Sequence, residues 1–312
     1  MIYTVSLNPS LDRTLCVPRL RLGELNRAQV LRQDLAGKGM NVSRALQALG
    51  IDSAIVGFVG GAVGRKLRQG LIEAGFAVYL IEVIEESRQN ITLLDRSTGE
   101  YTKINEPGAG VNAGHLEAMR ALVGDLTRPG DIWTFCGSLP PGAPADIYAQ
   151  LIRLVRARGG KAFLDSSGAA LEAGLAARPF GLKPNDEEAS ALLGMPLAAE
   201  PACRKAVALL RARGVKLAAL TRGARGLVLG MNGRTVVAHP PPVDARSPIG
   251  AGDATLAGLV WAVADGCGAI EAARRAVACG AAAAMQEGTA VGDRALVESL
   301  LPRVLIDPSS VC

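Results

Sequence analysis

Short apolar strands alternate with longer helices along most of this chain, and that alternation restricts the fold more than any other feature of the sequence. Apolar runs typical of buried strands occupy residues 2–7, 55–59, 132–136, 162–165, 217–221 and 227–229, and helical patterns occupy 67–74, 146–158 and 203–213. Strands joined through helices pair in parallel and need helices on both faces of the sheet. We therefore predict an α/β fold with a mostly parallel sheet. With 312 residues, 49% of them hydrophobic, residues 1–312 can form a single domain around a large core.

Two stretches, residues 14–32 and 89–104, break this alternation. Both show the two-residue periodicity of strands without an intervening helix, and Ser97-Thr98-Gly99-Glu100 is a hairpin-turn sequence. We expect these stretches to form a small antiparallel β lid outside the main sheet, built from about 12–33 and 88–106.

A glycine-rich loop that ends in a carboxylate, residues 250–253, leads into a helix. The helix is indicated by apolar residues at i, i+3, i+4 and i+7 (Leu256, Leu259, Val260, Val263). Glycines let a phosphate approach the backbone, and the free N–H groups of a first helical turn attract anions. The loop therefore suits phosphoryl transfer, with Asp253 as the base for the attacking hydroxyl and with the transferred group stabilised by N–H groups of Gly250, Ala251 and Gly252. Taken alone, an N-terminal cap on a glycine-rich turn explains the same residues equally well.

A second glycine-flanked helix start precedes the apolar pattern Val42, Leu46, Leu49. It is predicted to face a ligand through Gly37, Lys38, Gly39 and Asn41, with Lys38 meeting a phosphate already on the substrate. Further candidates for the substrate are Arg88, Arg27 and Ser138. The Arg88 guanidinium suits phosphate recognition, although a solvated hinge charge is the alternative, and Arg27 is the weaker candidate for the same duty. Ser138 lies in a tight turn after a buried strand, where its hydroxyl can hydrogen-bond to a substrate.

Several segments together resemble the phosphofructokinase B branch of the ribokinase-like sugar kinases, in order and spacing from Ile2 to about Val304. The residues that carry the resemblance are Asn8-Pro9-Ser10-Leu11-Asp12, Ala36-Gly37-Lys38-Gly39-Met40-Asn41-Val42-Ser43, Arg88-Gln89-Asn90, Gly137-Ser138-Leu139-Pro140-Pro141-Gly142, Asp165-Ser166-Ser167, Lys183-Pro184-Asn185-Asp186-Glu187-Glu188 and Gly250-Ala251-Gly252-Asp253. The resemblance implies a ribokinase-like fold and ATP-dependent phosphorylation of a ketohexose phosphate. Within the branch the chain is most similar to the 1-phosphofructokinases, which implies conversion of fructose 1-phosphate to fructose 1,6-bisphosphate. The 6-phosphofructokinases and tagatose-6-phosphate kinases of the same branch are the alternatives.

The same resemblance assigns roles to individual residues. It places Asp12 and Asn90 at the sugar, and it places at the nucleotide Lys183, Asn185, Glu188, Thr221, Gly223, Gly226, Gly250 and Gly252. Asn185 and Glu188 would hold Mg²⁺ through water, because this ion keeps most of its hydration shell. It also implies a backbone K⁺ site around Ser247, Ile249, Ala283, Gln286 and Gly288, and a homodimer formed through the lid.

Composition narrows the remaining function classes. The net charge is +5, but the basic residues are scattered and aromatic residues make up only 4%, so we expect anionic small substrates and no nucleic acid. Six cysteines without a CxxC pair favour free thiols in a reducing cytoplasm. The chain opens directly on a strand-like run and has no uninterrupted apolar run of about 18 residues, so we expect neither secretion nor a membrane partner.

Two other classes stay open. A nucleoside or vitamin kinase of the wider superfamily would share residues 250–253 but would have less need of Lys38 and Arg88. A catalytically idle sugar-phosphate sensor would have no use for Asp253 as a base.

Overall fold

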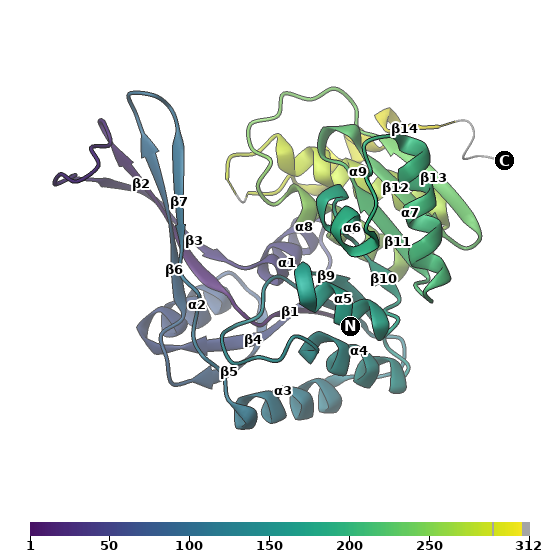
Figure 1. The fold of residues 1–312 in the computed structure, drawn as a ribbon, viewed down its shortest axis with the longest axis horizontal. Coiled ribbons are helices and arrows are strands. Elements are labelled where there is room, and N and C mark those ends of the chain that lie inside the picture. Colours follow the sequence, from purple (N-terminus) through teal and green to yellow (C-terminus); the bar gives the residue numbers. More distant parts are fainter. Residues whose placement is uncertain (289, 308–312) are drawn as a thin grey trace.

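The main sheet has the predicted mostly parallel architecture. The computed structural model describes residues 1–288 and 290–307. The strands of this sheet are β1 (Ile2–Ser6), β4 (Ala54–Gly60), β5 (Ala77–Val83), β8 (Ile132–Cys136), β9 (Lys161–Asp165), β10 (Gly181–Leu182), β11 (Leu217–Thr221), β12 (Leu227–Met231), β13 (Arg234–His239) and β14 (Leu305–Ile306). Their order is β14-β13-β12-β11-β10-β9-β8-β1-β4-β5 (Figure 1). In this spatial order, all pairings from β5 across the sheet to β11 are parallel. The pairings of β11 with β12, β12 with β13 and β13 with β14, at one edge, are antiparallel.

Helices cover both faces of the sheet, as the alternation predicts. They are α1 (Lys38–Ala48), α2 (Gly61–Glu73), α3 (Ala113–Leu126), α4 (Ile147–Ala157), α5 (Gly168–Ala176), α6 (Asp186–Leu193), α7 (Glu200–Ala212), α8 (Ala251–Ala264), α9 (Ala269–Ala284) and α10 (Arg294–Leu300). Within residues 1–288 and 290–307, no helix has the length and apolar character needed to cross a membrane.

Successive side chains of the central strands enter two separate cores. In β11, Leu217 and Ala219 pack with α1, α8 and α9, whereas Ala218 and Leu220 pack with α3, α4, α5 and α7. Successive side chains of a strand point to opposite faces of the sheet. Because both faces of this sheet are covered by helices, each central strand contributes to both cores. The two cores hold the sheet rigidly, and its carboxyl-terminal strand ends therefore form a fixed platform for a site.

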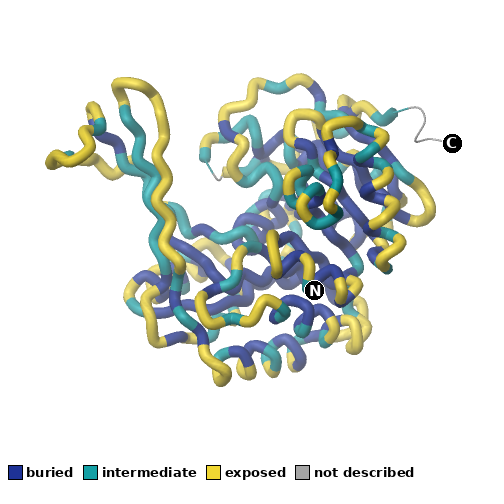
Figure 2. Tube along the Cα trace, in the orientation of Figure 1, coloured by how far each residue is buried: buried dark blue, intermediate teal, exposed yellow. Residues whose placement is uncertain are grey.

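The β lid is a second sheet that projects from the main body (Figure 1). Its strands are β2 (Ser10–Val17), β3 (Gln29–Ala36), β6 (Arg88–Asp95) and β7 (Tyr101–Asn105), in the order β3-β2-β6-β7. The predicted hairpin connects β6 and β7. The outer pairings are antiparallel as expected, but β2 and β6 pair in parallel at the centre because they come from two separate excursions of the chain. Most of the lid is exposed or half-buried (Figure 2), since one layer of strands has nothing packed over its outer face.

Candidate active site

The glycine-rich loop forms the start of helix α8. Gly250 is the N-cap residue, with φ 79° in the left-handed region that glycine adopts without strain, and the helix begins at Ala251. Asp253 therefore lies in the first turn, where it is only 7% exposed. Of the predicted N–H donors, that of Ala251 contacts the Pro248 carbonyl at 3.4 Å. The first turn presents its positive end toward whatever occupies the space in front of Asp253.

Asp253 has the properties of a base that works near neutral pH. Burial raises its pKa to about 6, and the negative charge of Asp165 acts in the same direction. A hydrogen bond from Asn41 Nδ2 to Asp253 Oδ2 (2.8 Å) opposes this rise, as do the positive charges of Lys38 and Lys183. The carboxylate is consequently ionised at pH 7 and is a stronger proton acceptor than an exposed aspartate.

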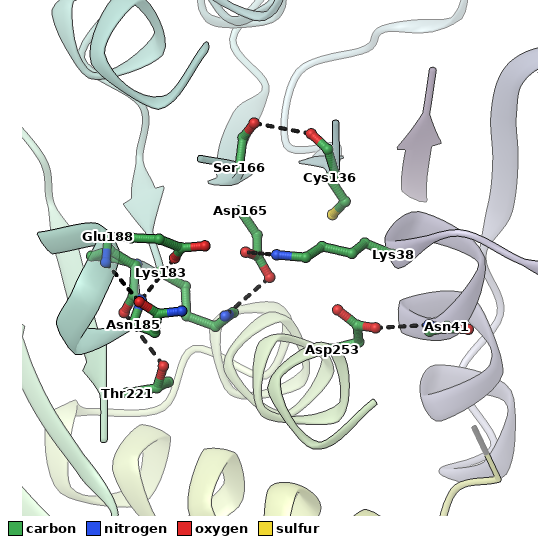
Figure 3. A network of polar contacts seen from close by, with 12 residues as sticks. Lys38, Asn41, Cys136, Asp165, Ser166, Lys183, Asn185, Glu188, Thr221 and Asp253 are labelled. Atoms are coloured by element: carbon green, nitrogen blue, oxygen red, sulfur yellow. Dashed lines mark hydrogen bonds and ion pairs between the residues drawn. The ribbon is translucent and has the colours of Figure 1, made fainter. Parts of the chain in front are cut away.

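Asp165 joins the two lysines of the site. Its side chain, at the end of β9, is 1% exposed and accepts a hydrogen bond from Lys38 Nζ at Oδ1 (2.9 Å), while Lys183 Nζ lies 3.0 Å from Oδ2 (Figure 3). Burial alone would raise the pKa of Asp165, but Lys183 and Lys38 outweigh it and hold the pKa below its usual value. The same pairing raises the pKa of Lys38 despite its burial. Asp165 therefore pairs with both lysines, and the charges of all three groups act on Asp253.

A cavity of about 220 Å³ opens in front of these groups. It is lined by Lys38, Asp165, Lys183, Asn185, Glu188, Thr221, Gly250, Gly252 and Asp253. All of the predicted nucleotide residues except Gly223 and Gly226 thus lie together around it. A Cβ atom added to Gly252 would lie 3.6 Å from Lys183 Nζ, so the absence of a side chain at this position leaves the lysine accessible from the loop.

A second cavity, of about 340 Å³, adjoins the first. It is lined by Ser6, Asn8, Gly37, Lys38, Arg88, Asn105, Cys136, Gly137, Ser138, Ser166, Ser167 and Glu188. Lys38 and Glu188 line both cavities, so two ligands bound side by side would meet at Lys38. The basic residues of this lining are Lys38 and Arg88, which makes the second cavity suitable for an anionic ligand.

Asn185 and Glu188 cap helix α6. Asn185 Oδ1 accepts from the Glu188 N–H (2.7 Å), and Glu188 Oε2 accepts from the Asn185 N–H (2.9 Å). Among the described residues no group of three or more His, Cys, Asp or Glu side chains could enclose a metal. The donors fit Mg²⁺ held through water and nucleotide phosphates, because the Glu188 carboxylate still faces the cavities (Figure 3) and such a site needs few protein ligands.

Polar side chains of the lid lie on the same paired strands as Arg88, which lines the second cavity. Asn90 Nδ2 donates to Asp12 Oδ1 (2.8 Å) and to Ser10 Oγ (3.0 Å), across the register that pairs β2 with β6. Asn90 Oδ1 is buried and has no hydrogen-bond partner in the described part of the chain, which is the expected state of a group that binds a ligand hydroxyl. Arg88 donates to the Asn8 carbonyl (3.2 Å), and its burial lowers the pKa of the guanidinium, an effect that Asp12 opposes.

Other predicted residues lie outside the linings of both cavities. Gly39 is buried where a Cβ would lie 2.6 Å from the Val5 carbonyl, so this glycine allows α1 to pack on β1 and does not face a ligand. Gly226 is restricted in the same way by the Ala238 carbonyl (2.1 Å), and Gly223 begins the turn Gly223–Arg225 after β11. Arg27 is exposed in the connection between β2 and β3.

The residues of the expected K⁺ site do converge. Ser247 Oγ donates to the Gly288 carbonyl (3.4 Å) and accepts from the Ile249 N–H (3.2 Å). The Ala283 carbonyl accepts from the Gln286 N–H (2.9 Å). Carbonyl and hydroxyl oxygens are thus grouped beside the loop that leads into α8, and oxygen is the donor type that alkali cations take.

Asp165 is the main functional residue to which the sequence interpretation gave no role. The signal was present, because a carboxylate at the end of a buried strand faces whatever the neighbouring parallel strands present at the same edge. Ser6, Asn8, Asn105, Cys136, Ser166 and Ser167 were likewise not predicted to line a ligand cavity.

Comparison with known proteins gives a consistent result. The profile of the family described as pfkB family carbohydrate kinase matches residues 6–295. The 1-phosphofructokinase of Rhodobacter capsulatus is 37% identical over 278 residues, which cover 89% of this chain and 88% of that protein. The ATP-dependent 6-phosphofructokinase isozyme 2 of Escherichia coli (strain K12) is 32% identical over 291 residues, covering 92% and 94%. The crystal structure of phosphofructokinase-2 from Escherichia coli in complex with potassium superposes with a TM-score of 0.92 at 29% identity, covering 96% of this chain and 98% of that one.

Proposed function

Because the chain belongs to the pfkB family of carbohydrate kinases, we propose that it transfers the γ-phosphoryl group of ATP to fructose 1-phosphate and forms fructose 1,6-bisphosphate. The observation that carries the proposal is the position of Asp253, a buried carboxylate with a pKa of about 6, in the lining of the first cavity, which shares Lys38 with the second. A carboxylate of that pKa can accept a hydroxyl proton during phosphoryl transfer.

In the proposed reaction ATP occupies the cavity next to α8 and the sugar phosphate occupies the other. Asp253 takes the proton of the free primary hydroxyl as its oxygen attacks the γ-phosphorus, and the bond from that phosphorus to the departing ADP oxygen breaks. Lys38, Lys183 and the N–H groups of Gly250, Ala251 and Gly252 face the charge on the transferred group. Asn185 and Glu188 would hold Mg²⁺ through water, and the ion would supply positive charge to the nucleotide phosphates.

The sugar phosphate is bound by the residues of the second cavity and the lid. We assign the existing phosphate to Arg88, whereas the sequence interpretation assigned it to Lys38, because Lys38 is paired with Asp165 and also lines the cavity of Asp253. Asn90, Asp12 and Ser138 supply hydroxyl partners. The similarity to the Escherichia coli 6-phosphofructokinase keeps fructose 6-phosphate as the second candidate.

We further propose that the chain binds K⁺ near Ser247 and Gly288, and that the lid forms a homodimer. The K⁺ proposal rests on the grouped oxygens there and on the relative solved with potassium. The dimer proposal rests on exposed apolar side chains of the lid region, which include Leu22, Leu25, Val30, Leu31, Tyr101 and Ile104. The cysteines of the described residues are all free, which fits a reducing compartment such as the cytoplasm, whereas Cys312 lies outside the described residues.

The test is ATP turnover with fructose 1-phosphate, fructose 6-phosphate and tagatose 6-phosphate measured side by side. We expect the highest kcat/KM with fructose 1-phosphate, and we expect Asp253→Asn to lower kcat by about 10²–10⁴-fold. Asp125→Asn, an exposed aspartate on α3, is the matched control and leaves kcat unchanged. Preference for a 6-phosphate would replace the substrate and keep the mechanism, whereas absence of turnover on all three would contradict the proposal.

A further inference from the structure

Arg44 connects the residues around Asp253 to the lid, although it lines neither cavity. Arg44 and Asn41 are three residues apart on α1 and therefore share a face of the helix. Arg44 Nη1 donates to Asn41 Oδ1 (3.3 Å), and Arg44 Nη2 donates to the carbonyl of Leu35 in the lid strand β3. Asn41 Nδ2 in turn donates to Asp253 Oδ2 at 2.8 Å. A continuous series of hydrogen bonds thus runs from β3 to the proposed base.

This series determines how the Asn41 amide is oriented. An amide presents an acceptor on one side and a donor on the other, whereas a guanidinium has donors only. The atom of Asn41 that faces Arg44 must therefore be the oxygen, which leaves the NH₂ group facing Asp253. If Arg44 were absent, the amide could rotate and place its oxygen against the carboxylate, an arrangement that disfavours the ionised form.

On these contacts, and resting on the proposed function for the role of Asp253, we propose that Arg44 is a positioning residue. It fixes the Asn41 amide, and through it the Asp253 carboxylate, relative to lid strand β3. The other charged groups that face Asp253 are Asp165, Lys38 and Lys183, whereas the hydrogen bonds of Arg44 go to Asn41 and to Leu35. Arg44 itself faces Asp34 and Asp12, whose charges stabilise the guanidinium against its burial.

The proposal predicts a pH signature. Losing a hydrogen bond to a charged group should raise the pKa of Asp253 by about one unit, from about 6 to about 7. For Arg44→Met, the ratio of variant to wild-type kcat should then fall about five-fold more at pH 6 than at pH 8.5, because a smaller fraction of the base is ionised at pH 6. The ratio cancels the ionisation of the substrate phosphates, which is common to both enzymes.

The control is Arg68→Met. Arg68 on α2 also donates from a half-buried guanidinium to a strand carbonyl, that of Leu80 (3.0 Å), but it lies outside the linings of both cavities. Its kcat ratio should not vary with pH. A pH-independent ratio for Arg44→Met as well would overturn the proposal and leave Arg44 with a packing role only. If Arg44→Met does not fold, Arg44→Lys should give a smaller change in the same direction, and a flat ratio for that variant would also overturn it.

A second measurement is independent of turnover. The carboxyl ¹³C titration of Asp253 in the free protein, assigned by its loss in Asp253→Asn, should move to higher pH in Arg44→Met. If the wild-type protein turned over none of the ketohexose phosphates, the proposed function would fail while this titration still decided the role of Arg44. An unchanged Asp253 titration would refute the positioning role whatever the substrate.

Discussion

Replacing Asp165 by asparagine keeps the shape of the side chain and removes the negative charge that joins the two lysines. Breaking a buried ion pair costs about 3–5 kcal/mol, because the remaining charge stays uncompensated in the interior. Lys183, with a side chain 5% exposed, carries most of that cost. Lys38 is 38% exposed and regains solvation, so we place the loss at the lower end, about 3 kcal/mol. For a chain of this size that corresponds to a fall in Tm of about 6 °C.

The same substitution should make Asp253 more acidic. Asp165 raises the pKa of Asp253 by its charge, and it also neutralises Lys38 and Lys183, which lower that pKa. Removing the charge of Asp165 therefore lowers the pKa of Asp253 both directly and by leaving the two lysine charges uncompensated. The acid limb of the rate profile should therefore move below pH 6 even as the protein becomes less stable.

The assay combines urea unfolding at pH 7.5 with kcat measured from pH 5 to 8.5. Asp131→Asn is the matched control, because Asp131 is also a buried carboxylate (6% exposed) paired with a cation, the N-terminal ammonium at 2.9 Å, and it lines neither cavity. It should lose stability without moving the acid limb. An Asp165→Asn protein as stable as the wild type, or one whose acid limb moves to higher pH, would refute the reasoning.

Three further outcomes are expected. Asp253→Asn should raise the free energy of unfolding by up to about 3 kcal/mol at pH 7.5, because the folded-state pKa of Asp253 lies above its unfolded value of about 4. The gain should appear as pH rises from about 4 to 6 and be absent below, which thermal unfolding across that range checks. Gly252→Ala should fold normally but raise the KM for ATP, because the added Cβ has room beside Lys183 yet occupies the space through which a phosphate reaches the loop. Gly250→Ala should also lower the Tm, because the φ of Gly250 is positive. Equal Tm values for the two variants would contradict this. Ile104→Asp in the lid should halve the mass seen by sedimentation if the lid forms the dimer. Ile84→Asp changes an isoleucine that is more exposed (89% against 55%) but lies outside the lid strands, and it should leave the mass unchanged.

Local patterns predicted much of the fold. The spacing of Leu256, Leu259 and Val260 correctly places residues 250–253 at the N-terminus of α8, and the strand-helix alternation predicts the parallel sheet. Both depend on interactions between residues close in sequence, or on the burial that such a pattern requires. The parallel pairing of β2 with β6 could not be derived in this way, because it depends on how two distant excursions meet.

The ion pairs of the site could not be predicted from the sequence for the same reason. Lys38, Asp165 and Lys183 are separated by 127 and 18 positions, and only the order of the strands brings them within ion-pair distance. Asn185 and Glu188 show a different difficulty. Their spacing fits a metal-binding pattern and a helix capping box alike, and the structure shows that they form the capping box while also facing the cavities.

The site must satisfy two opposing requirements on Asp253. The carboxylate has to be buried so that its pKa rises toward neutrality, yet it must stay ionised to accept a proton. Lys38 and Lys183 alone, facing an empty interior, would hold the pKa too low and would be costly to bury. The negative charge of Asp165 offsets part of the charge of the two lysines. The neutral Asn41 amide further stabilises the ionised Asp253 through one hydrogen bond. Because that bond can be lost by a rotation of the amide, the base depends on whatever fixes Asn41, and Arg44 with the Leu35 carbonyl is what does so.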